Sequence, residues 1–157
     1  RVQGLATAAG CQLVASCDLA IASNIAKFCT PGVHIGLFCS TPMVALSRNI
    51  TRKSAMQMLL TGEEIDAETA EKYGLINCSV EHNELDMTIN SYCSKIKNKS
   101  PLTLAIGKEA FYRQLEMGLS DAYEYTSEVM TKNMMARDAA EGIDAFLQKR
   151  EPVWKGK

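Results

Sequence analysis

The sequence has no strong excess of charge and no long apolar segment. Its 17 Lys and Arg residues nearly balance its 18 Asp and Glu residues, which gives a formal net charge of -1 at pH 7. A nucleic-acid-binding surface and a membrane-surface patch are therefore unsupported, because each needs a concentration of basic residues. The apolar stretch over residues 2–17 is interrupted by polar residues and is too short to span a bilayer.

Cysteine motifs typical of metal sites are also missing. The chain has no C-x-x-C pair and no cysteine beside a histidine at metal-ligand spacing. Small cysteines on apolar backgrounds usually behave as core residues in reducing compartments. The sequence therefore predicts free thiols and no metal centre. The cysteines in question are Cys11, Cys17, Cys29, Cys39, Cys78 and Cys93.

The chain does have the composition of one globular domain, with 157 residues of which 46% are hydrophobic. Thr51, Asp66 and Ser100 each stand where a side chain can cap the start of a helix. Strands are predicted over residues 18–22, 28–30 and 76–80. Helices are predicted over residues 9–16, 52–61, 67–73, 85–96, 101–115, 120–135 and 138–150. Strands early and helices late indicate the α/β class, followed by a helical region.

A run of small residues precedes the first predicted helix. Residues 4–10 read Gly-Leu-Ala-Thr-Ala-Ala-Gly, and such side chains let backbone amides approach a ligand closely. The free N–H groups and the positive dipole end of the helix would point at that ligand, so an anion or oxyanion site is predicted there. The chain opens on Arg1 and enters what we predict to be a strand end over residues 2–4. We therefore expect an earlier segment, with any targeting peptide, to lie outside it.

These motifs, taken in order, resemble those of the crotonase superfamily, the enoyl-CoA hydratase and isomerase fold. Each motif alone is weak, but the ordered set covers nearly the whole chain. The segments that match are residues 4–13, 60–67, 74–76, 100–101 and 141–150. The resemblance implies a spiral ClpP/crotonase fold, of which this chain is the C-terminal half. Residues 1–80 would be the end of the core, with half of an oxyanion hole, and residues 81–157 a helical region for trimerisation and coenzyme A contact.

The resemblance also implies roles for individual residues. The backbone N–H of Ala9 would be the second oxyanion donor, and the first would lie upstream of Arg1. The family's hydratases carry glutamates at two positions that are Gln12 and Gly32 here. Hydration needs a base to activate water and an acid to protonate carbon, and neither replacement can ionise. Residues 37–42 stand where the family has a glycine-rich turn, which predicts a reshaped pocket wall.

Coenzyme A would be held by the positions that match Lys108, Phe146 and Lys149, since lysine attracts phosphates and phenylalanine offers a face to adenine. A solvated helix face for the lysines, and ordinary trimer or core packing for the phenylalanine, are the alternatives. His34 lies near the lost carboxylate position and could titrate near neutral pH. Without an orienting carboxylate in the sequence, a surface or structural role is favoured for it.

The expected function is that of an acyl-CoA thioester-binding protein of mitochondrial fatty-acid metabolism, with doubtful hydratase activity. The mitochondrial assignment comes from resemblance to one subgroup of the family. A homotrimer or a dimer of trimers is expected, with no cofactor beyond the thioester ligand. Two alternatives remain open. One is a different crotonase chemistry, such as hydrolysis, isomerisation or decarboxylation, that uses residues upstream of Arg1; the other is a non-catalytic regulatory trimer subunit.

Overall fold

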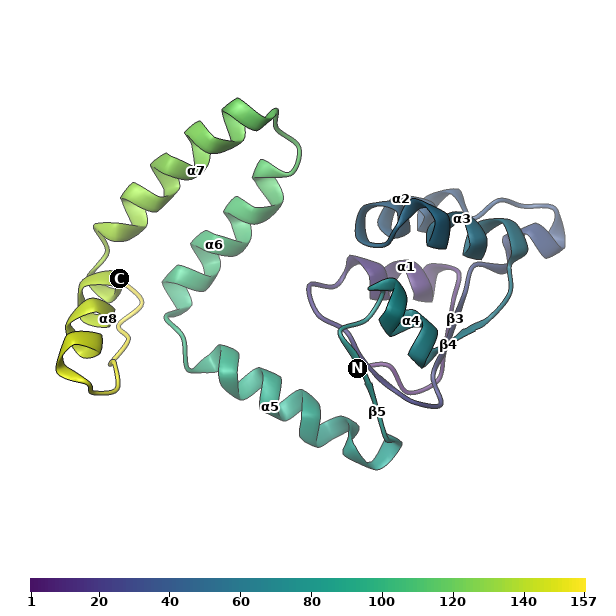
Figure 1. The fold of residues 1–157 in the computed structure, drawn as a ribbon, viewed down its shortest axis with the longest axis horizontal. Helices are drawn as coiled ribbons and strands as arrows, with labels where there is room; N and C mark the ends of the chain where they lie inside the picture. Colours follow the sequence, from purple (N-terminus) through teal and green to yellow (C-terminus); the bar gives the residue numbers. More distant parts are fainter. The chain divides into compact units, whose positions relative to one another are not determined.

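The computed structural model describes residues 1–157, which divide into two compact units, residues 1–92 and residues 93–157 (Figure 1). The strands and the first helices lie in unit 1, and the long helices lie in unit 2. The strands of unit 1 are β1 (Leu5–Thr7), β2 (Ile21–Ser23), β3 (Lys27–Cys29), β4 (Ile65–Asp66) and β5 (Cys78–Val80). Its helices are α1 (Ala9–Ser16), α2 (Ser40–Asn49), α3 (Arg52–Thr61) and α4 (Ala67–Tyr73), with 3-10 turns η1 (Pro31–Ile35) and η2 (His82–Glu84).

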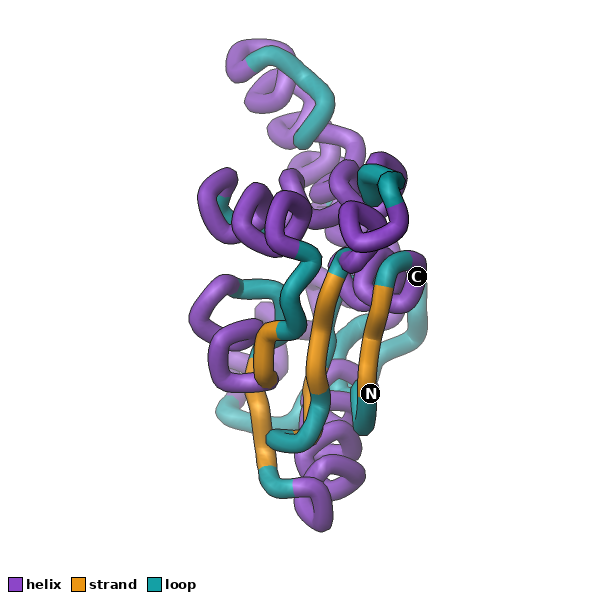
Figure 2. The backbone as a smooth tube through the Cα atoms, turned by 90° about the vertical axis from the view of Figure 1, so that its right-hand side faces the viewer, coloured by secondary structure: helices purple, strands orange, loops and turns teal.

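The strands form two small sheets, drawn in orange in Figure 2. In the first, β1 pairs in parallel with β3, and β3 pairs antiparallel with β4. In the second, β2 pairs in parallel with β5, and Val2 adds a parallel bridge to Ala22 on the other side. Because parallel neighbours need a crossover, helices return the chain between the paired strands. This arrangement leaves the end of β1 free to lead directly into α1.

Local capping explains why several helices begin and end where they do. Thr51 accepts a hydrogen bond from the Ser54 N–H at 3.2 Å, and Asp66 accepts one from the Thr69 N–H at 2.8 Å. Both satisfy first-turn donors that a helix cannot satisfy itself. Gly74 ends α4 with φ of 80°, a backbone conformation that is unfavourable for residues with a Cβ atom. These boundaries agree with the sequence predictions.

The core of unit 1 forms where the strands meet α1, α2, α3 and α4. Phe28 on the central strand β3 is fully buried, as is Leu46 on α2. Thr30 is buried too, and its hydroxyl donates to the Met58 carbonyl at 2.9 Å, so the chain after β3 is tied to α3. That tie fixes the start of the loop that forms one wall of the candidate site.

Unit 2 is helical, and the C-terminal residues of the chain pack against its helices. Helix α5 (Leu85–Lys97) leads into it, followed by α6 (Pro101–Gln114), α7 (Leu119–Met134) and α8 (Arg137–Gln148). Buried Asp138 accepts hydrogen bonds from the Ser100 hydroxyl at 2.6 Å and from the backbone N–H groups of Lys155 and Gly156. Trp154 also donates its indole N–H to the Asn98 carbonyl. The last residues are thus held against the starts of α6 and α8.

Three sequence expectations need correction. Of the strand end expected over residues 2–4, only Val2 pairs, through its bridge to Ala22, and the first full strand is Leu5–Thr7. The second strand is Ile21–Ser23 rather than 18–22. In each case the partner strand sets the bounds of a three-residue strand, and residues 18–19 lie before the paired register of β2. Helix α2 over Ser40–Asn49 was not predicted at all. Its start carries no side-chain cap hydrogen bond, so the local sequence gives no start signal.

None of the helices combines the length and the apolar composition that a membrane-spanning segment would need. All six cysteines are free, in agreement with the sequence prediction. No group of three or more His, Cys, Asp or Glu side chains converges in a way that could hold a metal ion.

Candidate functional site

The candidate site begins at the peptide between β1 and α1. Ala8 adopts φ of 47° and ψ of -110°, in the positive-φ region that is costly for a residue with a Cβ. Its N–H donates to the Cys29 carbonyl at 3.0 Å, and its carbonyl accepts from the Gln12 N–H at 3.0 Å. Both sides of the residue are therefore fixed by hydrogen bonds. Backbone strain of this kind tends to be kept at functional sites.

The fixed geometry of Ala8 directs the next amide, that of Ala9. Ala9 is the first residue of α1, and the N–H groups of a first helical turn have no partner within the helix. No side chain caps this helix, and its first turn carries no acidic residue. The first-turn donors and the positive end of the helix dipole are thus available to a negatively polarised ligand atom.

A pocket of about 490 Å³ lies at this helix start. This volume is within the range of small-molecule sites. One side is formed by the start of α1, and the other by η1, the loop that follows it and the first turn of α2. The lining residues are Ala8, Ala9, Pro31, Gly32, His34, Ile35, Leu37, Phe38, Cys39, Ser40, Thr41 and Pro42. The structure therefore brings Ala9 and Gly32 to one pocket, and no carboxylate lines it.

Gly32 is tightly covered by the loop that follows η1. The Leu37 N–H donates to the Gly32 carbonyl at 2.9 Å, which folds the loop back on it. A Cβ built on Gly32 would lie 2.8 Å from the Leu37 carbonyl oxygen and 2.9 Å from the Cys39 Sγ. Real Cβ atoms essentially never approach so closely. The space where a side chain of residue 32 would start is filled by backbone and by the Cys39 sulfur.

We therefore expect Gly32→Ala to destabilise the protein by about 1–3 kcal/mol, because a backbone carbonyl must move to admit the methyl group. Gly10→Ala is the matched control, since a Cβ at Gly10 meets nothing within 4 Å in α1. That control should stabilise by about 0.5–1 kcal/mol, the usual preference of a helix for alanine over glycine. Urea denaturation of both variants measures the difference. Equal stability of the two variants would show that the loop over residues 37–39 moves away from residue 32 at no cost in free energy.

Gln12 does not join this pocket. It lies half-buried on α1, its carbonyl accepts a hydrogen bond from the Ser16 hydroxyl at 2.8 Å, and it is not among the residues that line the cavity. Of the two positions at which the resemblance places glutamates, the structure thus puts only Gly32 in the wall. That Gln12 stands at the position of a catalytic glutamate remains a prediction from the resemblance.

His34 lies in the pocket wall and has an orienting partner that the sequence did not reveal. Its Nε2 is 3.3 Å from the Gly62 carbonyl oxygen, at the end of α3. If Nε2 carries the proton and donates it to that carbonyl, Nδ1 keeps a lone pair. A Cβ on Gly62 would approach the same ring at 2.8 Å, so glycine leaves room for the histidine. His34 and Cys39 are the titratable side chains of the lining.

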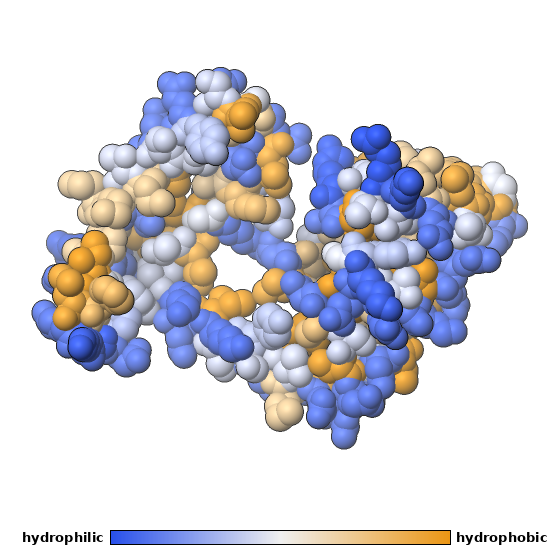
Figure 3. Space-filling view, viewed as in Figure 1, coloured by the Kyte–Doolittle hydropathy of each residue, from blue (hydrophilic) through white to orange (hydrophobic).

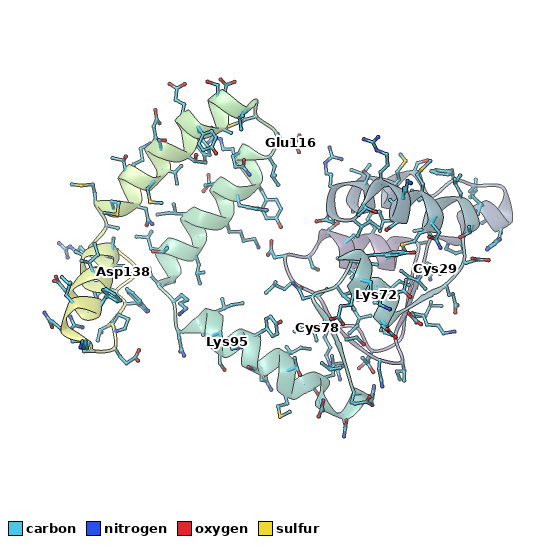
Figure 4. All side chains as sticks on the ribbon, in the orientation of Figure 1. Cys29, Lys72, Cys78, Lys95, Glu116 and Asp138 are labelled. Atoms are coloured by element: carbon cyan, nitrogen blue, oxygen red, sulfur yellow. The ribbon has the colours of Figure 1, made fainter.

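The thiols near the pocket have different surroundings. Burial, followed by the nearby thiol groups of Cys29 and Cys39, raises the pKa of Cys11 to about 12, so Cys11 stays a protonated core residue. Cys29, labelled on β3 in Figure 4, is buried and donates to the Thr7 hydroxyl at 3.2 Å. Cys39 is only half-buried and lines the cavity. The sequence analysis did not identify Cys39 as a pocket residue. The sequence feature that could have pointed to it is that residues 37–42 differ from the family's glycine-rich turn.

The positions predicted to contact coenzyme A all lie in unit 2. Lys108 is exposed on α6, while Phe146 and Lys149 are exposed at the end of α8. Phe146 is 81% exposed and lines a second cavity of about 450 Å³ together with Trp154. The structure therefore brings Phe146 and Lys149 to one helix end and places Lys108 on another helix.

Two carboxylates stabilise this part of unit 2. The Arg150 guanidinium, followed by the Val153 N–H, lowers the pKa of Glu141 to about 2. The Ser100 hydroxyl and the tail N–H groups hold the pKa of Asp138 below its usual range. Asp138 lies beside the C-terminal tail in Figure 4. Both groups stay ionised at neutral pH and act as structural acceptors.

Comparison with known proteins gives consistent matches. A sequence model of the family described as enoyl-CoA hydratase/isomerase matches residues 1–157. The chain is 53% identical over 154 residues to a Xenopus laevis protein named enoyl-CoA hydratase domain-containing protein 3, mitochondrial, and 52% identical over 153 residues to the human protein of that name. These matches cover 98% of this chain, with 52% of the Xenopus and 50% of the human protein. The chain thus spans about half the length of the curated relatives it matches.

Solved structures agree with the sequence matches. A structure described as enoyl-CoA hydratase from Mycobacterium smegmatis superposes with a TM-score of 0.95 at 51% identity, covering 98% of this chain and 60% of that one. The human domain-containing protein 3 superposes with a TM-score of 0.93 at 53% identity, covering 96% of this chain and 60% of that one.

Proposed function

The chain belongs to the enoyl-CoA hydratase/isomerase family, and on that premise we propose that it binds acyl-CoA thioesters but hydrates them poorly. The observation that carries the proposal is the pocket at the start of α1. It combines the free amide end of a helix at Ala9 with a lining that contains no carboxylate. The crotonase fold predicted from the sequence is confirmed by the structural matches.

In this proposal the thioester carbonyl oxygen accepts a hydrogen bond from the Ala9 N–H. The donor is part of the main chain, so alanine in place of glycine preserves it. Charge that develops on this oxygen, when the thioester becomes an enolate, is stabilised by the N–H and by the dipole of α1. A second donor would come from the part of the full-length protein that precedes this chain.

Hydration would need more than an oxyanion site. Water must lose a proton and the α-carbon must gain one, and each transfer is normally assisted by a positioned acid or base. Gln12 cannot ionise and lies outside the lining, and Gly32 has no side chain and no room for one. The lack of an ionisable side chain at both positions supports binding of the thioester without efficient hydration.

Unit 2 supports the remaining parts of the proposal. Lys108 and Lys149 would attract the phosphates of coenzyme A, and the exposed ring of Phe146 would pack on its adenine. Figure 3 shows apolar surface over α8. Several large apolar side chains of this unit are more than half exposed, and such a surface is typical of an interface. They are Phe111, Leu115, Leu119, Tyr123, Met130, Met134, Met135, Phe146, Leu147 and Val153.

These exposed side chains support self-association, and the family resemblance makes a homotrimer or a dimer of trimers the proposed assembly. A mitochondrial location is proposed because the relatives at about half identity carry that word in their names. The ligand is coenzyme A thioester, and no resident cofactor or metal takes part in the proposal. Analytical ultracentrifugation of the full-length protein would check the assembly.

Calorimetric titration of the full-length protein with butyryl-CoA tests the binding proposal, because this saturated thioester cannot be hydrated. We expect saturable binding that is weakened roughly tenfold by Ala9→Pro, the value of about one lost hydrogen bond. Proline is tolerated at a first helical position, but it also restricts the conformation of the preceding residue, here Ala8 at positive φ, so urea denaturation must show that the variant folds as stably as the starting protein. Gly10→Ala, which keeps every amide, is the control. Absence of saturable binding would favour a regulatory trimer subunit, and an unchanged affinity of Ala9→Pro would remove Ala9 from the site.

A further inference from the structure

Cys39 occupies the part of the pocket from which the family's second glutamate would extend. Its Sγ lies 2.9 Å from the position of a Cβ on Gly32, and the residue lines the cavity together with Ala9. The rest of the wall is formed by apolar, hydroxyl and imidazole side chains. The pocket thus holds a sulfur nucleophile where a hydratase would hold a carboxylate.

A thiol in that place has a specific chemical partner. The β-carbon of an α,β-unsaturated thioester is electrophilic, and a thiolate adds to it readily because sulfur is intrinsically nucleophilic. The negative charge that results is carried by the thioester oxygen, the atom that the proposed function places on the Ala9 N–H. The same amide that would stabilise an enolate in hydration would stabilise the enolate formed by sulfur addition.

We propose that Cys39 captures α,β-unsaturated acyl thioesters covalently, an inference that rests on the proposed function of the same pocket. The Cys39 Sγ forms a bond to the β-carbon, the carbon–carbon π bond breaks, and its electron pair becomes an enolate on the thioester oxygen. The α-carbon then takes a proton, and the thiol has lost one. The net change is addition of S–H across the double bond, without an oxidant or a further reactant.

His34 is the group of the lining that can carry this proton. It lies in the same wall, and its Nε2 contacts the Gly62 carbonyl oxygen at 3.3 Å. In the proposal, Nδ1 accepts the thiol proton through water in the pocket and returns it as the enolate collapses. His34→Gln should therefore slow adduct formation at Cys39 and should change its pH profile, whereas a purely structural role would leave the profile unchanged.

The other cysteines supply internal controls. Cys17 and Cys93 are exposed and lie outside the lining, so they should react in proportion to the concentration of any electrophile. Cys11 and Cys29 are buried, and Cys11 has a pKa of about 12, so neither should react in the folded protein. Only a thiol that reacts within a binding pocket should show a rate that saturates with thioester.

The test is incubation of the full-length protein with crotonyl-CoA, followed by digestion and mass spectrometry of each cysteine. We expect an adduct of the mass of crotonyl-CoA at Cys39, formed at least about tenfold faster than at Cys17 or Cys93, because a bound reactant has a high effective concentration. Its rate should saturate and should be suppressed by butyryl-CoA. Cys39→Ser should abolish it, and Cys93→Ser should leave it unchanged.

Different failures can be told apart by calorimetry on the same samples. If butyryl-CoA binds and Cys39 stays unlabelled, or is labelled at a rate that is linear in thioester and unprotected, the covalent capture is wrong and the proposed function stands. If butyryl-CoA does not bind, the proposed function fails, and the inference that rests on it is overturned as well. Saturable, protected labelling of Cys39 supports both.

Discussion

Crotonyl-CoA is expected to be hydrated by the full-length protein about 10⁴-fold more slowly than by a family member with both glutamates. General acid and base assistance each contribute roughly 10²–10⁴ in rate, so even the lower figures multiply to this loss. The physical reason lies in the pocket, where no side chain of the lining is a carboxylate. Disappearance of the conjugated thioester absorbance beyond one equivalent per protein, followed at equal protein concentrations, measures the ratio.

A rate within about tenfold of such a relative would contradict this expectation, because it would require an acid and a base that the lining does not contain.

Restoring the carboxylates supplies a second check. Gln12→Glu combined with Gly32→Glu should gain little, since the Leu37 carbonyl and the Cys39 sulfur fill the space at residue 32. A large gain would mean that the loop over residues 37–39 opens without cost.

Phe28→Ala is expected to reduce the free energy of unfolding by about 3–5 kcal/mol, the usual result of emptying a buried aromatic site. Phe28 has 0% exposure and lies on β3, the central strand between β1 and β4. Domains are stable by only about 5–15 kcal/mol, so the variant should unfold at much lower denaturant concentrations. Guanidinium denaturation with linear extrapolation gives the value.

The control for this measurement is Met87→Ala on α5, where the side chain is 67% exposed. Surface changes usually stay within about 0.5 kcal/mol of the starting protein, so the two variants should be clearly separated. A loss below about 1 kcal/mol for Phe28→Ala would show that the sheet collapses around the missing ring, which would make the site more plastic than its tight contacts indicate.

The helices were the most predictable part of the fold because their start signals are local. Thr51, Asp66 and Ser100 cap their helices as predicted, each through a hydrogen bond to an amide three residues later. Strand bounds could not be predicted in the same way, because pairing with a distant segment decides which residues of a short apolar run are extended. The second strand runs over Ile21–Ser23 rather than the predicted residues 18–22 because these are the residues that pair with β5.

Helix α2 shows a different limit. Its first residues, Ser40 to Pro42, resemble a loop, although proline is acceptable in a first helical turn. The helix packs against α1, and this packing stabilises it without a cap signal. A sequence pattern that considers one segment at a time does not contain that contact.

For the candidate site, the small residues before α1 and the family resemblance pointed to Ala9 and Gly32, and the structure places both in one pocket. The catalytic meaning of these positions stays a prediction. The proximity of Cys39 to Gly32 could not be derived from sequence, because it depends on how the loop folds back through the Leu37 N–H. The contact between His34 and the Gly62 carbonyl could not be derived from sequence either, because it joins residues 28 positions apart.

The conformation of Ala8 also sets a direction for laboratory evolution. With φ of 47°, this residue pays a conformational cost of about 1 kcal/mol that glycine would avoid. Alanine and glycine codons differ only at their second base, so the relaxed residue is a single mutational step away. A population selected for heat resistance should therefore acquire Ala8→Gly early. Because Ala8 also directs the Ala9 amide, such a selection would alter the proposed thioester recognition and heat resistance through the same codon.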